Sequence, residues 1–179
     1  SHGDTKHVLL IPSTPKECFD FSVEAFDLAD RIQTPVIVLS DLDLGMNDWT
    51  TPEFQWDDSK EYDRGKVLSR EDLENSDTWG RYIDVDGDGI PYRTYPGTHP
   101  EKGAYFTRGT SHDEKAKYTE DGKVNAENLS RLLRKYQTAS ELVPRPEFNQ
   151  DSNTSTIGVI YFGSTEASMK ETLDMLERE

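Results

Sequence analysis

The stretch that decides the fold is residues 8–39, VLLIPSTPKECFDFSVEAFDLADRIQTPVIVL. It begins and ends with short apolar runs, 8–11 and 36–39, each of which is typical of a strand. Between them, apolar residues recur at steps of three and four, which predicts one face of a helix: Cys18, Phe21, Ala25, Leu28 and Ile32. The order strand, helix, strand, with wholly apolar strands, predicts a parallel βαβ unit in an α/β fold.

The start of this helix has its own signal. Thr14 and Glu17 have the spacing of a capping box, and Pro15 stands at the first helical position. A capping box satisfies free N–H groups at a helix start, and proline fits there because it has no N–H to leave unpaired. We therefore expect the helix to begin at Pro15.

The middle of the chain, residues 41–124, has no regular hydrophobic period and is rich in Gly, Pro, Asp and aromatic residues. An irregular stretch of this length inside a domain indicates either function or disorder. Its many Trp, Tyr and Phe residues favour an ordered loop excursion, because they provide apolar surface that can pack. A short helix is expected at residues 69–74.

Regular structure is expected again in the last third of the chain. A helical stripe starts at Asn125, a candidate N-cap, and ends at Pro144. Residues 144–155 are polar and read as a linker, and residues 157–162 form an apolar run that predicts a strand before a final helix. We predict one domain over 1–143 with the excursion 41–124, a linker at 144–155, and the first βα unit of a second α/β domain at 156–179.

The composition excludes several classes of partner. The net charge is −15, and Lys and Arg are not clustered anywhere in the chain. Binding of nucleic acid or of an anionic membrane depends on such clusters, so neither partner is expected. No run approaches the ~20 apolar residues of a membrane span. The single cysteine, Cys18, excludes an internal disulfide and fits a cytoplasmic location.

The segment 84–89, DVDGDG, resembles the first half of a calcium-binding loop. Carboxylates at alternate positions can converge on one hard cation, so Asp84, Asp86 and Asp88, with the carbonyl of Ile90, are candidate ligands for Ca²⁺ or Mg²⁺. The second half of such a loop is missing, because Tyr95 stands where an EF-hand places its glutamate. The alternative is a turn in which the aspartates accept hydrogen bonds from local amides.

Two further residues are candidates for chemistry. Arg93 lies between prolines and aromatic residues, a setting that suits a guanidinium bound to a carboxylate or phosphate, or one paired with nearby aspartates. His112 is followed by Asp113 and Glu114, so a raised pKa and a role in proton transfer are one hypothesis. A structural histidine is the other. Anion or ligand sites are also conceivable at Asp41, after the second strand, and at the helix start 163–165.

Taken in order, several segments resemble the α-subunits of 2-oxoacid:ferredoxin oxidoreductases, and the 2-oxoglutarate type most of all. The resemblance covers nearly the whole chain and rests on these segments: 35–42 (PVIVLSDL), 44–47 (LGMN), 80–83 (GRYI), 84–89 (DVDGDG), 90–93 (IPYR), 96–98 (PGT), 112–114 (HDE) and 160–165 (IYFGST). It implies the end of a transketolase-like, thiamin-pyrimidine-binding domain. It also implies that Arg93 and Thr98 bind the substrate and that His112 is a candidate catalytic residue.

The resemblance carries further expectations about cofactors and partners. The family oxidatively decarboxylates a 2-oxoacid on thiamin diphosphate, passes the acyl group to coenzyme A, and sends electrons through an iron–sulfur cluster to ferredoxin. Thiamin diphosphate, its Mg²⁺ and the cluster are held mainly by the β-subunit. Ferredoxins are acidic, so an α-chain of net charge −15 is expected to leave their docking to the β-subunit. The chain alone should be an inactive fragment. The competing hypothesis is a non-enzymatic calcium-binding interaction module.

Overall fold

The structure is a computed structural model, and it describes residues 6–109, 111–148, 157–176 and 178. The chain divides into two compact units. Unit 1 contains residues 1–7, 28–34 and 62–143, and unit 2 contains residues 8–27, 35–61 and 144–179. The helix α1 contributes to both units. The domain limits expected from the sequence, with a division at 144–155, stay a prediction, and most of that segment lies outside the described residues.

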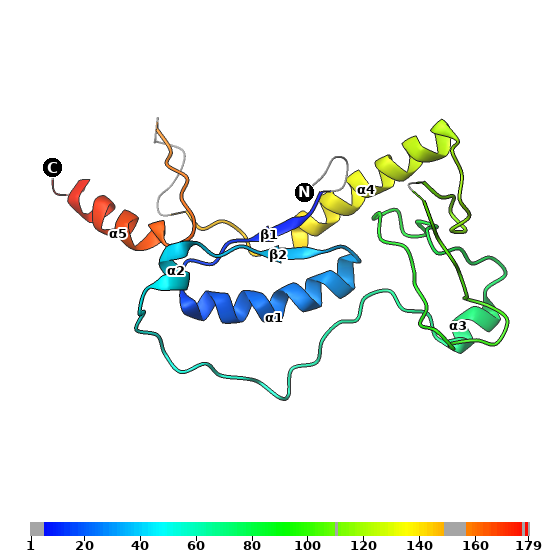
Figure 1. Cartoon of the computed structure of the whole chain (residues 1–179), viewed down its shortest axis with the longest axis horizontal. Helices are drawn as coiled ribbons and strands as arrows, with labels where there is room; N and C mark the ends of the chain where they lie inside the picture. The colour runs from blue at the N-terminus through cyan, green and yellow to red at the C-terminus, as the bar shows by residue number, and fades with distance from the viewer. Residues whose placement is uncertain (1–5, 110, 149–156, 177, 179) are drawn as a thin grey trace. The chain divides into compact units, whose positions relative to one another are not determined.

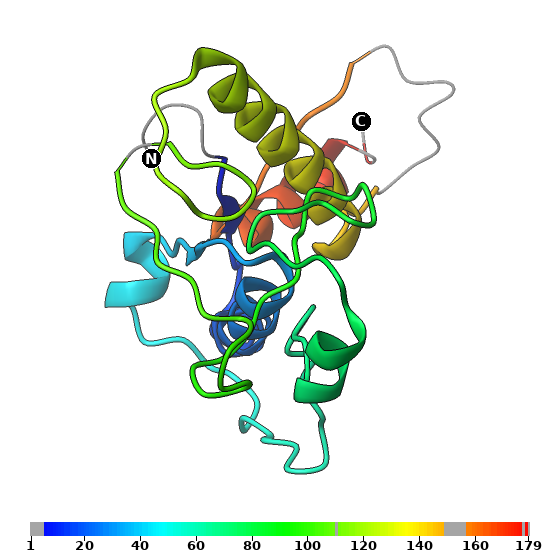
Figure 2. The same cartoon turned by 90° about the vertical axis from the view of Figure 1, so that its right-hand side faces the viewer.

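The predicted βαβ unit is confirmed. Strands β1 (Val8–Leu10) and β2 (Val36–Val38) pair in parallel, with Val8 opposite Val36. Helix α1 (Pro15–Ile32) connects them and runs along one side of the strand pair (Figure 1, Figure 2). Two residues of the predicted helical face, Leu28 and Ile32, are fully buried. The pair is two strands wide among the described residues.

The start of α1 follows its sequence signal with one difference. The N–H of Glu17 donates to Thr14 Oγ1 (3.1 Å), as a capping box requires. The carboxylate of Glu17 accepts from the N–H of Ser13 (2.7 Å), one residue before the expected donor. The side chains of Thr14 and Glu17 thereby pair two backbone N–H groups at the helix start, those of Glu17 and Ser13.

The excursion in the middle of the chain is irregular, as predicted. Its helices are α2 (Leu42–Met46), which the sequence did not predict, and α3 (Arg70–Asn75). Helix α3 starts at the expected place, and Ser69 caps it in a complete capping box with Asp72. Elsewhere in the described part of the excursion, isolated backbone bridges join Val67 to Arg93 and His112 to Tyr118.

Two features of the last third differ from the sequence prediction: the start of one helix and the presence of a strand. Helix α4 (Gly122–Leu142) begins one turn earlier than expected, because Asp121 rather than Asn125 accepts from the first amides. The predicted strand over 157–162 is wrong: these residues pair with no other strand in the described parts of the chain. A strand exists only through its ladder hydrogen bonds. Four apolar side chains there are largely exposed: Ile157, Val159, Ile160 and Phe162.

The final helix is confirmed as α5 (Thr165–Leu176). Among the described residues, no helix combines the length and the apolar character required to cross a membrane.

Candidate functional site

Arg93 is fixed through its backbone. Its N–H donates to the carbonyl of Lys66 (2.9 Å), and its own carbonyl accepts from the N–H of Leu68 (2.9 Å). Two residues earlier, Pro91 has a restricted φ, and its carbonyl accepts from Gln33 Nε2 (2.7 Å) at the end of α1. The side chain of Arg93 therefore leaves the backbone from a well-defined position.

The guanidinium of Arg93 is held at the last turn of α1. Its Nη2 donates to Asp30 Oδ1 (3.0 Å) and to the carbonyl of Arg64 (2.8 Å). The other oxygen of Asp30 lies 2.7 Å from Arg64 Nη1, so one carboxylate holds two arginines. The side chain of Arg93 is 19% exposed, and its Nε finds no hydrogen-bond partner among the described residues. The sequence allowed pairing with aspartates of the neighbouring loop; the structure instead uses Asp30, 63 residues away.

The close approach of this segment to α1 depends on Gly65. Its φ is +70°, and a Cβ there would lie 2.8 Å from the carbonyl oxygen of Asp30 and 2.9 Å from Arg31 Cα. Both atoms belong to the backbone and cannot move aside cheaply. Glycine is required at this position both for its left-handed backbone and for its small size.

Thr98 and Arg93 are both linked to Tyr95. Thr98 closes a turn in which its N–H (3.2 Å) and its hydroxyl (2.8 Å) both donate to the carbonyl of Tyr95. Gly97, with a φ of +83°, makes that turn possible. The ring of Tyr95 lies 5.5 Å from the guanidinium carbon of Arg93. The hydroxyl of Thr98 is thus used within its own turn. Among the contacts of the described residues, none joins Thr98 to Arg93.

His112 is held mainly by stacking and by its backbone. Its ring stacks on the ring of Tyr82 with centroids 3.7 Å apart. Its carbonyl accepts from Asn128 Nδ2 on α4 (2.7 Å). The carboxylate of Asp113 accepts from the N–H groups of Lys115 and Lys117 (2.9 Å each). The neighbouring carboxylate expected to act on His112 is therefore used to close the loop.

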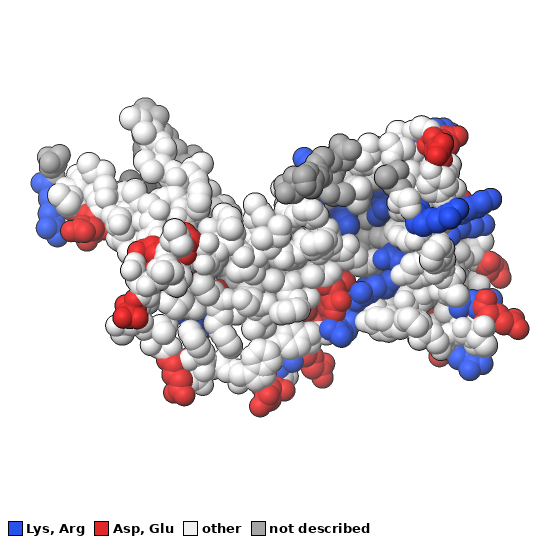
Figure 3. All heavy atoms as spheres, viewed as in Figure 1, with Lys and Arg blue, Asp and Glu red and all other residues white. Residues whose placement is uncertain are grey.

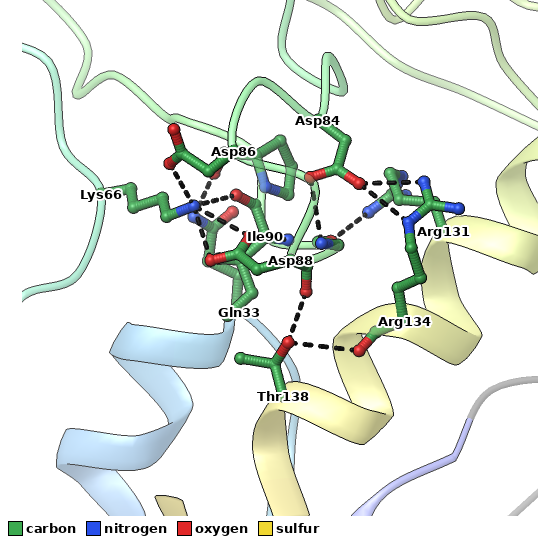
Figure 4. A network of polar contacts seen from close by, with 11 residues as sticks. Gln33, Lys66, Asp84, Asp86, Asp88, Ile90, Arg131, Arg134 and Thr138 are labelled. Atoms are coloured by element: carbon green, nitrogen blue, oxygen red, sulfur yellow. Dashed lines mark hydrogen bonds and ion pairs between the residues drawn. The ribbon is translucent and has the colours of Figure 1, made fainter. Parts of the chain in front are cut away.

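The aspartates of the DVDGDG loop do not converge on a common point (Figure 4). Lys66 Nζ lies where the sequence places a metal ion: it donates to Asp86 Oδ2 (2.6 Å), Asp88 Oδ1 (2.9 Å) and the carbonyl of Ile90 (3.0 Å). Asp84 points elsewhere, to Arg134 Nη2 (2.9 Å). Among the described residues, no three His, Cys, Asp or Glu side chains are grouped so that they could hold a metal ion.

The metal hypothesis for Asp84, Asp86 and Asp88 stays a prediction, and the contacts of the described residues in this loop are those of the alternative, a turn. The N–H of Gly89 donates to Asp84 Oδ1 (3.0 Å), and the N–H of Ile90 donates to Asp88 Oδ1 (2.9 Å). Burial opposes the charge of Lys66, but hydrogen bonds to Asp86 and Asp88 outweigh it and raise the pKa of this lysine. An ammonium group organises the loop in the way that a metal ion does in a calcium-binding loop.

Comparison with known proteins places these features in a family. Residues 2–138 match the family model described as "Pyruvate flavodoxin/ferredoxin oxidoreductase, thiamine diP-bdg". The chain belongs to this family. It is 31% identical over 182 residues to 2-oxoacid:ferredoxin oxidoreductase 2, subunit alpha, from Aeropyrum pernix, and the match covers 99% of this chain and 27% of that relative. The resemblance stated from the sequence is confirmed.

Two further relatives of this oxidoreductase family bear on the type of substrate and on the fold. The 2-oxoglutarate synthase subunit KorA of Methanothermobacter marburgensis is 56% identical over 41 residues, 23% of this chain and 11% of that protein. A 2-oxoglutarate:ferredoxin oxidoreductase from Magnetococcus marinus, solved with 2-oxoglutarate, coenzyme A and succinyl-CoA, matches with a TM-score of 0.82 at 24% identity. That match covers 99% of this chain and 30% of the solved chain, and it shows the fold. The chain spans under a third of these relatives.

The sequence did not identify Asp30, which holds Arg93, or Lys66, which holds the DVDGDG loop. Asp30 is a carboxylate on the polar side of α1, and Lys66 is an isolated lysine in an irregular segment; neither belongs to a motif. One indirect signal could have pointed to Lys66. The DVDGDG segment lacks the closing glutamate of a calcium loop, and a cation from the protein can neutralise its carboxylates instead.

The two other candidate ligand sites, Asp41 and the helix start 163–165, are hydrogen-bonded to each other. Asp41, after β2, accepts from the N–H of Leu44 at the start of α2 (3.0 Å) and from the N–H of Ser164 at the start of α5 (2.9 Å). These hydrogen bonds, the one from Leu44 first, lower the pKa of Asp41. The anion expected at the helix start 163–165 is thus the side chain of Asp41.

Proposed function

We propose that this chain is part of the α-subunit of a thiamin-diphosphate-dependent 2-oxoacid:ferredoxin oxidoreductase, with 2-oxoglutarate as the 2-oxoacid. The reaction is oxidative decarboxylation to the acyl-CoA, with electrons delivered to ferredoxin. Membership in the family supports the reaction class. The 2-oxoglutarate synthase subunit and the 2-oxoglutarate oxidoreductase among its relatives support the choice of substrate.

The observation that carries this proposal is the way Arg93 is held. Its backbone is bridged to residues 66–68, and its Nη2 is anchored by Asp30 and by the carbonyl of Arg64. Its Nε is buried and has no hydrogen-bond partner among the described residues. A planar guanidinium that is already oriented before a ligand binds suits a carboxylate, because little further ordering is needed on binding. Arg93 is thus proposed to bind the carboxylate of the 2-oxoacid.

The cofactors are proposed to lie mainly on the partner subunit. Thiamin diphosphate supplies the carbanion-stabilising chemistry of decarboxylation. Its Mg²⁺ has no suitable group of ligands among the described residues, since Lys66 occupies the space between Asp86 and Asp88. An iron–sulfur cluster needs cysteine thiolates, typically four, and the chain has only Cys18. The β-subunit, coenzyme A and ferredoxin, docked through the β-subunit, are the proposed partners.

The test of the Arg93 proposal is kinetic and uses the α-subunit assembled with its β-subunit. Arg93→Ala should lower kcat/KM for 2-oxoglutarate about 30- to 1,000-fold, since losing one partner of a buried charge pair costs about 2–4 kcal/mol. Arg93→Lys should recover part of the loss. The matched control is Arg70→Ala, which removes an exposed arginine paired with Glu74 in α3 and should leave the kinetics unchanged.

The pattern of the loss separates a ligand role from a folding role. A carboxylate-binding residue should raise the KM for 2-oxoglutarate while the KM for coenzyme A stays within about twofold of the wild type. Equal losses for both substrates, together with a lower melting temperature, would sink the proposed role. Thr98 and His112 stay proposals of the same kind, for substrate binding and proton transfer. We do not favour the calcium-binding module. Its only support was the sequence of the DVDGDG loop, and the aspartates of that loop do not converge on a common point.

A further inference from the structure

Three basic side chains of unit 1 lie close together, and two of them bind the residue that follows α1. Arg81 Nη2 donates to Gln33 Oε1 (2.7 Å), and Lys135 Nζ donates to the backbone carbonyl of Gln33 (3.1 Å). Arg131, one turn before Lys135 on α4, donates from Nη1 to the carbonyl of Gly89 (3.1 Å) and is only 8% exposed. All three cations are therefore bound to neutral oxygens. We call Arg81, Arg131 and Lys135 the basic cluster.

No carboxylate pairs with the basic cluster within the described residues. The closest acidic influence is Asp84, whose carboxylate is already used by Arg134 Nη2 (2.9 Å) and by the N–H of Gly89 (3.0 Å). Burial, followed by the charges of Arg131 and Arg81, lowers the pKa of Lys135 to about 8. In a chain of net charge −15, three cations that meet without an acid are an unusual local arrangement.

The basic cluster also contains buried donors that lack acceptors. Arg81 Nε and Nη1, Arg131 Nε and the nearby Trp79 Nε1 are buried and have no hydrogen-bond partner in the part of the chain that the structure describes. Every one of these four atoms is a donor, so a group that pairs with them must be an acceptor. Buried polar groups are almost always paired in folded proteins, and unpaired donors in one cluster point to a ligand that accepts from them.

Aromatic rings cover the donors but cannot accept from all of them. The guanidinium carbons of Arg81 and Arg131 lie 5.0 and 5.5 Å from the centre of the Tyr82 ring. Tyr105 lies 5.6 Å from Arg81 and 6.0 Å from the ring of Trp79. Tyr105 is 43% exposed, so it is the covering side chain that can move with the least loss of burial. Its displacement would open the donors of Arg81 to a ligand.

We propose that Arg81, Arg131 and Lys135 form a binding site for a phosphate or diphosphate group. Guanidinium groups suit phosphate because their parallel N–H donors match its oxygens, and several cations suit its multiple charge better than they suit a single carboxylate. In the space-filling view, Lys and Arg side chains gather over the region of α3 and α4, where several line a recess (Figure 3). This site is independent of the role proposed for Arg93.

The binding test uses isothermal titration calorimetry of the full 179-residue chain with inorganic pyrophosphate at low ionic strength. Arg131→Gln and Arg81→Gln should each weaken binding at least tenfold. Arg70→Gln removes the same charge from an exposed position and should weaken binding less than twofold. Tyr105→Ala, which removes the cover, should bind pyrophosphate at least as tightly as the wild type. No detectable binding by the wild type up to about 10 mM, or equal weakening in Arg70→Gln, would overturn the proposal, because each lost charged contact should weaken binding about tenfold.

Two further arms separate a phosphate site from a purely structural role of the basic cluster. Without ligand, Arg131→Gln should melt at the same or a higher temperature than the wild type, because it removes an unpaired buried charge. A marked drop in melting temperature, together with wild-type pyrophosphate affinity, would show a structural arginine and overturn the proposal.

ADP tests whether the site accepts an esterified diphosphate. Binding comparable to that of pyrophosphate indicates a nucleotide-type ligand, and binding of pyrophosphate alone indicates a free anion. Succinate that binds more tightly than pyrophosphate would overturn the assignment to phosphate.

Discussion

The segment 8–39 and the segment 62–121 are ordered in different ways. The first consists of β1, α1 and β2, and its order comes from a strand ladder and from a helix face that buries Leu28 and Ile32. The second contains one short helix and isolated bridges, and it is held by side chains that reach backbone groups or opposite charges. Periodic apolar residues therefore organise the first segment, whereas individual polar contacts organise the second.

The largest effect we expect comes from crowding the polar segment. Gly89→Ala would place a Cβ 2.6 Å from the carbonyl oxygen of Arg131 and closer still to the nitrogen of Lys135, both in the backbone of α4. The φ of Gly89 is +81°, so strain adds to the overlap. Unfolding should become easier by about 2–6 kcal/mol, measured by urea denaturation.

Gly87 provides the matched control in the same loop. It also has a positive φ, +74°, but a Cβ there would meet nothing within 4 Å. Gly87→Ala should therefore cost only the backbone term, about 1–2 kcal/mol. Equal effects of the two substitutions would mean that the loop does not pack on α4 as the structure has it.

The regular segment should respond to loss of apolar contact instead. Leu28 is fully buried, and Leu28→Ala should destabilise the protein by about 2–5 kcal/mol through lost burial and the cavity left behind. Phe26, on the same helix, is 81% exposed, so Phe26→Ala should change the free energy of unfolding by less than about 0.5 kcal/mol. Thermal melting of the two variants side by side checks this, and a larger effect at Phe26 would contradict the packing of α1.

The same contrast explains which features could be predicted from the sequence. The helix at 15–32 and its two strands follow from period and capping signals, which are local. The start of α4 was misplaced by one turn, because Asp121 and Asn125 are both good caps and only the tertiary structure selects one. The partners Asp30 and Lys66 could not be predicted, because their contacts join residues far apart in the chain. The strand at 157–162 failed because apolar character alone does not supply a pairing partner.

A third prediction concerns pH and the buried lysine of α4. The pKa of Lys135 falls from 10.5 to about 8 in the folded chain, chiefly through burial. A lowered lysine pKa means that the folded state releases its proton first, so the free energy of unfolding should rise between pH 8 and 10.5 and stay flat below pH 8. The full rise corresponds to roughly 3 kcal/mol.

The measurement is the difference in free energy of unfolding between the wild type and Lys135→Met as pH increases. The contributions of the other ionisable groups are common to both proteins and cancel in the difference. Lys135→Met should be the more stable protein at pH 7.5, by up to roughly 2 kcal/mol after allowing for the lost hydrogen bond to Gln33, and this advantage should shrink as the pH approaches 10. A pH-independent difference would mean that Lys135 is not buried near the two arginines.

The smallest effect we expect is also the one that most directly tests how the polar segment is held. Lys66→Met keeps the length of the side chain but removes the cation between Asp86, Asp88 and the carbonyl of Ile90. The side chains of Asp86 and Asp88 are 42% and 32% exposed, so water screens part of the loss, and the free energy of unfolding should fall by only about 1 kcal/mol.

Calcium should then separate the two proteins. With the ammonium group removed, two carboxylates and a carbonyl remain around the space that Lys66 Nζ occupied, and these oxygens are suitable Ca²⁺ ligands. Added Ca²⁺ should raise the melting temperature of Lys66→Met and leave that of the wild type unchanged. A similar rise in both proteins would show that Lys66 does not stand in for a metal ion. The DVDGDG loop would then be a calcium loop, and the second segment would be held by a ligand rather than by its own side chains.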